Sequence, residues 1–205
     1  MIYKNDTLLQ PNLTFQQVKE LIAFGVDVNE VDEIGSTPLF YIHDLEIMKY
    51  LIAHGAKIDV KDEDGLTLLF DRSNIEILDF LRESGLNINE KNNRGMTPLF
   101  FADIRNIEYL IKHSSNINER NWLNRTPLPY YCKNTAYIAI KNGMIPSEIE
   151  TYHKFREYFS VEQQKAFDMF LTLTNNDNDF FHMCLVYQEG LKNNVKMDIK
   201  EMDIL

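Results

Sequence analysis

The sequence predicts an all-α solenoid of stacked helix pairs, capped at its C-terminal end by a helical segment. One observation is a four-residue motif, Thr-(Pro/Leu)-Leu-(Phe/Pro), that begins at Thr37, Thr67, Thr97 and Thr126. Its copies are 30, 30 and 29 residues apart. A second is a helix-ending series that keeps this interval through most of its length, formed by Gly25, Gly55, Gly85, Ser114 and Gly143. A fixed period of this length is typical of repeat units that stack on their neighbours.

Each predicted repeat contains a short inner helix, a second helix and a loop. Pro suits the first helical position because its missing N–H has no partner there, and the preceding Thr can cap the helix. Apolar residues three and four positions apart mark the second helix, as in Leu45, Met48, Leu51 and Ile52, and in Ile75, Leu78 and Leu81. The glycines then end these helices in the left-handed conformation. The recurring aromatic residue of the motif is expected in the core, at Phe40, Phe70 and Phe100.

These residues resemble the ankyrin repeat, whose unit is roughly 33 residues long and carries a Thr-Pro-Leu-His signature. The resemblance extends from about Thr7 to Gly143, with each unit about three residues short and the histidine replaced by Phe or Pro. An Asp or Asn three residues before a glycine-like position marks the loop that enters each repeat, at Asp32, Asp62, Asn92 and Asn121. The resemblance implies an ankyrin-like stack over residues 1–143 and a protein-binding role.

Past Gly143 the repeat pattern stops and three further helices are expected. The first covers residues 149–159, and a Ser-x-x-Gln capping box at Ser160 precedes the second. A break over 175–179 precedes the third, at 180–191, and residues 192–205 form a charged tail that reads as a short strand or a frayed helix. We interpret 144–205 as a cap over the open apolar end of the stack. A separate ligand-binding module is the alternative.

Composition predicts a cytoplasmic protein without membrane segments. The 205 residues are 44% hydrophobic and 25% charged, and they contain no apolar run long enough to cross a bilayer. The N-terminus lacks the basic-then-apolar profile of a signal peptide. Cys132 and Cys184 lie far apart without a disulfide framework, which is typical of structural thiols in a reducing compartment. A disulfide between them is the less favoured alternative.

No catalytic or metal site is recognisable, and we expect neither enzyme activity nor a cofactor. None of the five histidines lies at metal-ligand spacing from a Cys, Asp or Glu. Asp177, Asn178 and Asp179 resemble the start of a calcium loop, but the glycine and the twelfth-position glutamate are missing, so a solvated loop is preferred. An enzyme hidden in residues 144–205 is the least favoured class of function.

The charge distribution indicates a basic protein as partner. A net charge of −10 argues against nucleic-acid binding, which needs a clustered basic surface. Acidic residues dominate the first two loops, where they would attract a basic protein, although a merely solubilising face is the alternative. The predicted contact residues are four loop acids, the tryptophan of the fourth loop and three inner-helix aromatics: Glu30, Glu33, Glu63, Asp64, Trp122, Tyr41, Phe101 and Tyr131.

The predicted function is therefore a non-enzymatic interaction module that is monomeric when free. The favoured form is an inhibitor or immunity-type protein that neutralises a basic partner, for example a toxin enzyme. The alternative is an effector or scaffold that recruits its partner without blocking it.

Overall fold

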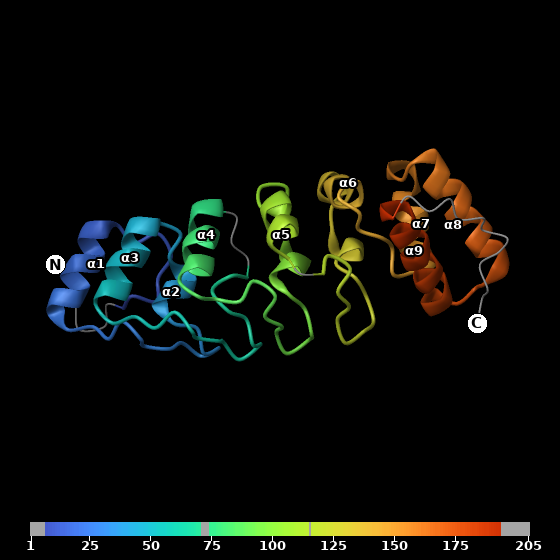
Figure 1. Cartoon of the computed structure of the whole chain (residues 1–205). Coiled ribbons are helices and arrows are strands. Elements are labelled where there is room, and N and C mark those ends of the chain that lie inside the picture. Colours follow the sequence, from blue (N-terminus) through green and yellow to red (C-terminus); the bar gives the residue numbers. More distant parts are fainter. Residues whose placement is uncertain (1–6, 71–73, 115, 194–205) are drawn as a thin grey trace. The chain divides into compact units, whose positions relative to one another are not determined.

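The computed structural model describes residues 7–70, 74–114 and 116–193 (Figure 1). The chain divides into two compact units, Met1–Pro98 and Leu99–Leu205. Helices and loops make up the described residues, which contain no β-strand. The all-α helical-repeat class predicted from the sequence is therefore confirmed.

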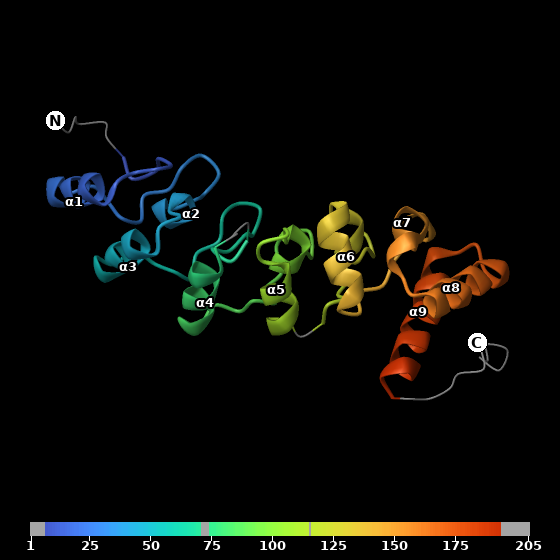
Figure 2. The same ribbon diagram turned by 90° about the horizontal axis from the view of Figure 1, so that it is seen from above.

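The first unit contains α1 (Phe15–Phe24), α2 (Pro38–Tyr41), α3 (Leu45–Ala53) and α4 (Ile75–Glu83). Helices α1, α3 and α4 lie side by side in chain order in both views (Figures 1 and 2). Their apolar stripes face inward, as the three- and four-residue spacing predicts. The fully buried side chains of this core include Val18, Leu39, Met48, Leu51, Leu68 and Leu78.

The helix ends of the first unit follow from local chemistry. Thr14 and Gln17 form a reciprocal capping box at the start of α1, and Asp44 accepts hydrogen bonds from two first-turn amides of α3. Left-handed glycines follow the longer helices, with φ of 96° at Gly55 and 101° at Gly85. No atom lies within 4 Å of a Cβ placed at either glycine, so only the backbone conformation requires glycine there.

The inner helices are reduced to single turns, and the predicted threonine caps at their starts are partly wrong. Besides the four-residue α2, the equivalent segments are a turn at 68–70 and the 3₁₀ turns η1 (Pro98–Phe101) and η2 (Leu128–Tyr130). Thr37 makes no capping bond, and its buried hydroxyl has no hydrogen-bond partner among the residues that the structure describes. The side chain of Phe40, which stands where the family has histidine, has no polar atom to offer it.

The second unit continues the repeat pattern and then departs from it. Helices α5 and α6 contact each other, α7 and η3 pack on α6, and α8 packs on α9. Gly143 is left-handed after α6, at φ 93°, whereas Ser114 after α5 has an ordinary φ of −78°. The elements of this unit are α5 (Ile107–His113), α6 (Lys133–Lys141), α7 (Ile149–Phe155), η3 (Arg156–Tyr158), α8 (Val161–Leu173) and α9 (Asp177–Lys192).

The last three α-helices enclose a core of aromatic rings. The Tyr152 ring centroid lies 5.4 Å from that of Phe167, and the Tyr152 hydroxyl donates to the Asp168 carboxylate at 2.6 Å. The capping box of Ser160 and Gln163 at the start of α8 is confirmed. The fully buried aromatic side chains are Tyr152, Phe155, Phe167, Phe170 and Phe180.

Helix α9 begins earlier than the sequence predicts. Asn176 caps it by accepting from the amides of Asn178 and Asp179, so the segment predicted as a break and a solvated loop forms the first helical turn. The carboxylates of Asp177 and Asp179 favour this start because they lie at the positive end of the helix dipole. Most of the predicted tail, residues 194–205, lies outside the described residues.

Candidate partner-binding surface

Four loops, which we call fingers 1 to 4, share one hydrogen-bonding pattern at their tips. In finger 1, the Asp32 carboxylate accepts from the amides of Ile34 (3.0 Å) and Ser36 (2.8 Å). The glycine-like residue of each tip is left-handed, a conformation that Gly and Asn tolerate best, with φ of 76° at Gly35 and 64° at Asn124. The acceptor residues that open the four fingers are Asp32, Asp62, Asn92 and Asn121.

Backbone hydrogen bonds join the tips of fingers 1, 2 and 3 within the first unit. The Glu63 amide donates to the Ile34 carbonyl and the Asn93 amide to the Asp64 carbonyl, each at 2.9 Å. The contact is so close that a Cβ on Gly65 would lie 2.9 Å from the Asn93 amide nitrogen. These bonds fix the spacing of neighbouring tips.

Three of the predicted acidic contact residues lie exposed on these tips. The side chains of Glu33, Glu63 and Asp64 all face solvent, the first on finger 1 and the others on finger 2. No cation forms an ion pair with any of the three among the residues described. Their charges are therefore available to attract a basic partner.

Glu30, also predicted as a contact residue, has a role in the fold instead. Its half-buried carboxylate accepts hydrogen bonds from the Leu8 amide at 2.7 Å and from the Thr7 hydroxyl. Leu8 is fully buried in the core. The Glu30 side chain thus holds the N-terminal segment against finger 1, which spacing along the sequence does not reveal.

Tyr41 is half-buried and donates its hydroxyl to the Asp32 carboxylate. This hydrogen bond lowers the pKa of Asp32 and raises the pKa of Tyr41. Because Asp32 organises the tip of finger 1, Tyr41 supports the finger from its side. Its ring is only partly accessible to a partner.

Trp122 lies at the tip of finger 4 and is 75% exposed, beside Leu123, which is 70% exposed. The sequence prediction of an exposed tryptophan is confirmed. Leu123 was missed because the other three fingers have Ile34, Asp64 and Arg94 at the same position, so the register gave no consistent indication. Together the two residues form an exposed apolar tip, the kind of surface that often marks an interaction site.

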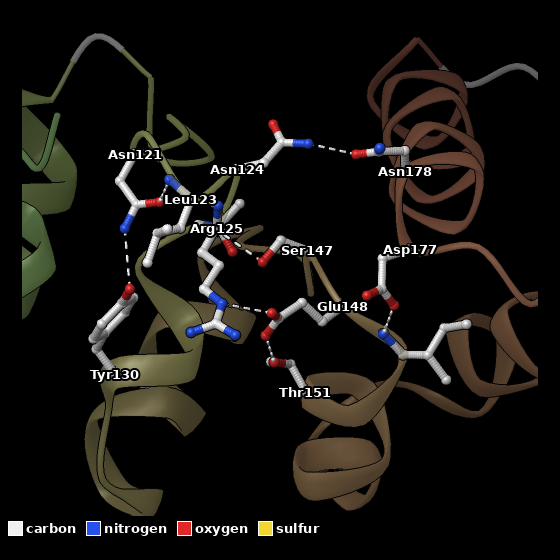
Figure 3. Close-up of polar contacts among 12 residues, drawn as sticks. Asn121, Leu123, Asn124, Arg125, Tyr130, Ser147, Glu148, Thr151, Asp177 and Asn178 are labelled. Carbon is white, nitrogen blue, oxygen red and sulfur yellow. Dashed lines mark hydrogen bonds and ion pairs between the residues drawn. The ribbon is translucent and has the colours of Figure 1, made fainter. Parts of the chain in front are cut away.

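Finger 4 is fixed to the helices that follow it (Figure 3). Asn124 donates to the side-chain oxygen of Asn178 at 2.5 Å, and the Arg125 Nε donates to Glu148 at 2.6 Å. The guanidinium of Arg120 lies 3.8 Å from the centroid of the Phe181 ring, and burial lowers its pKa. Trp122 therefore projects from a rigid support, which reduces the entropy lost on binding.

The remaining two aromatic residues differ from each other. Phe101 is 40% exposed, as a contact residue requires. Tyr131 is only 4% exposed, and its hydroxyl donates to the Leu99 carbonyl at 2.5 Å. The prediction that Tyr131 contacts a partner is wrong, because Tyr131 lies one position beyond the register of Tyr41 and Phe101, which Tyr130 occupies, and its side chain is buried. Burial raises the pKa of the Tyr131 hydroxyl well above its ordinary value.

Residues 11–92 match the family model for ankyrin repeats, in three copies. This segment consists of ankyrin repeats. The family resemblance read from the sequence is confirmed there, and ankyrin repeats are modules for protein–protein interaction. No curated protein matches the chain.

Among the described residues, no three His, Cys, Asp or Glu side chains are grouped so that they could hold a metal ion. Cys132 and Cys184 are both free thiols, so the alternative of a disulfide between them is wrong. Within the described ranges, no helix combines the length and apolar character needed to cross a membrane.

Proposed function

We propose that this ankyrin-repeat protein is an inhibitor or immunity-type protein that binds and neutralises a basic protein, such as a toxin enzyme, in the cytoplasm. The observation that carries the proposal is the set of exposed carboxylates of Glu33, Glu63 and Asp64 on fingers joined by backbone bonds. Such a fixed acidic surface speeds the encounter with a basic partner and disfavours acidic ones.

Trp122 supplies the second element of the proposed interface. Interface free energy concentrates in Trp, Tyr and Arg side chains that become fully desolvated on binding. An exposed tryptophan on a finger that Asn178 and Glu148 hold in place fits this role. In the free, monomeric protein the exposed indole contributes little to stability.

We further propose that residues 144–205 cap the repeats and bind no ligand of their own. Support comes from the contacts of α7 and η3 with α6, and from Thr126, whose amide and hydroxyl bond Ser147 and the Ile145 carbonyl. These two hydrogen bonds join Thr126 to the segment between α6 and α7.

The test is capture of the partner from the native cell with the tagged full-length chain, followed by an activity assay of the captured protein. We expect a basic protein whose activity falls to background when one equivalent of the chain is added. A captured partner that keeps full activity when saturated would identify the chain as a scaffold or effector. An acidic partner would contradict the role assigned to the fingers.

A further inference from the structure

An asparagine joins consecutive repeats in this chain. Asn29 donates its Nδ2 to the Gly55 carbonyl at 2.9 Å and accepts from the Lys57 amide at 2.9 Å. Asn118 makes the same two contacts with the residues that follow α6, at 3.4 and 2.9 Å. We call this pair of hydrogen bonds the asparagine bridge. One amide side chain thus satisfies a carbonyl and an N–H at the end of the next helix.

In the second repeat the bridging position is occupied by Asp59, whose carboxylate has no N–H to donate. In the described parts of the chain, no hydrogen bond reaches the Gly85 carbonyl or the Asp59 side chain. A pocket of about 300 Å³ opens at this point between the second and third repeats. Asp59 and Gly85 both line it.

The pocket pairs apolar walls with oxygen acceptors. Ile58, Val60 and Leu86 form half-buried walls, while the polar lining comes from Asp59, Thr67, Ser84, Asn87 and the Gly85 backbone. Lys61 also lines the pocket, but its Nζ lies 2.5 Å from the Glu90 carboxylate, which balances its charge. The Asp59 charge has no cationic partner in the described residues, so the pocket is net negative.

We propose that this pocket receives an arginine side chain of the basic partner. The guanidinium would donate to the Asp59 carboxylate and the Gly85 carbonyl, replacing the missing amide, while its methylene groups lie against the apolar walls. Arginine fits better than lysine because its planar, five-donor fork can serve two acceptors at once. The inference rests on the proposed function only in taking the partner to be a basic protein.

The experiment titrates Nα-acetyl-arginine amide into the isotope-labelled full-length chain and follows backbone amide resonances. We expect saturable shifts at residues 59 and 85–87, with affinity at least about tenfold weaker for the uncharged citrulline analogue. Asp59→Asn should restore the bridge, weaken arginine binding by about tenfold or more and raise the melting temperature. A melting temperature of the variant at or above that of the wild-type chain shows that its loss of binding does not arise from unfolding.

Two matched variants complete the design. Glu20→Gln removes the same charge from the exposed face of α1 and should change arginine affinity by less than about twofold. Asn29→Asp breaks the first bridge and should create arginine-dependent shifts at Gly55. Equal arginine affinities for the wild-type chain and Asp59→Asn, or shifts confined to other surfaces, would overturn the proposal.

Failure of the pocket and failure of the proposed function give different results. A basic partner that is inhibited equally by the wild-type chain and Asp59→Asn would overturn the proposed arginine site and leave the proposed inhibitor role intact. Arginine binding that depends on Asp59, together with capture of only acidic proteins, would support the pocket and overturn the inhibitor role.

Discussion

Trp122 offers the clearest separation of stability from binding at the scale of one residue. Because its side chain is 75% exposed, Trp122→Ala should change the unfolding free energy by no more than about 0.5 kcal/mol. Loss of a buried interface anchor should weaken partner binding about thirtyfold, or roughly 2 kcal/mol. Denaturant unfolding and binding titration of the same variant check both values. A large loss of stability with unchanged affinity would place the indole in the core.

Tyr41 and Asp32 give a pH-dependent prediction. The Tyr41 hydrogen bond lowers the folded-state pKa of Asp32 below its ordinary value of 3.8, so its stabilisation is fully present above that value and is lost as pH falls through the folded pKa. Tyr41→Phe should therefore destabilise the chain at neutral pH. The difference in stability between Tyr41→Phe and the wild-type chain should become small in strong acid, where Asp32 is protonated in both. Thermal unfolding of both proteins from neutral pH to strong acid tests this prediction. A stability difference that grows on acidification would contradict it.

The sequence predicted the exposure of some proposed contact residues correctly because their register was informative. Trp122 was placed on the surface because three other fingers carry polar residues at its position. Counted from the signature threonines, Tyr130 and not Tyr131 shares the register of Phe101: Tyr130 is 43% exposed and Phe101 is 40% exposed, whereas Tyr131 is buried. Glu30 accepts from Leu8, a long-range contact that no local pattern encodes.

At the scale of the elements, the glycines divide into two kinds with different costs of substitution. At Gly55 a Cβ meets no atom within 4 Å, so Gly55→Ala should cost about 1 kcal/mol, the conformational penalty alone. At Gly65 a Cβ would also lie 2.9 Å from the Asn93 amide nitrogen, so Gly65→Ala should cost clearly more. Denaturant unfolding of both variants measures the difference. Equal costs would indicate that fingers 2 and 3 can separate freely.

The longer helices were more predictable than the short inner helices of the repeats. Helix α3 and helix α8 have clear caps and apolar stripes, so their existence follows from local sequence. The inner helices shrink to single turns because each repeat is short, and the buried Thr37 hydroxyl shows that the signature threonine need not cap. The early start of α9 depends on Asn176 acting as cap, which an acidic loop pattern obscured.

At the scale of the whole molecule, the fold can be predicted from the sequence more completely than the candidate site. The repeat period determines where helices and fingers lie, because every unit must pack on copies of itself. The pocket at Asp59 follows instead from a single departure from the repeat, an aspartate where Asn29 and Asn118 bridge neighbouring repeats. Its consequence becomes visible only once the partner groups of those asparagines are known.

The net charge of −10 leads to a prediction about association kinetics for the chain as a whole. Reversing Glu33, Glu63 and Asp64 to Lys should slow association with the basic partner by about tenfold or more at low salt, with a smaller change in dissociation, because exposed charges act mainly on encounter. Raising the ionic strength to physiological levels should reduce this difference, since screening then acts over roughly 8 Å.

The fold of the triple variant should survive because these side chains face solvent. Stopped-flow mixing at several salt concentrations tests the prediction, with Glu46→Lys, at an exposed position of α3 outside the fingers, as a single-residue control. Association rates insensitive to both salt and the triple reversal would reduce the acidic tips to a solubilising surface.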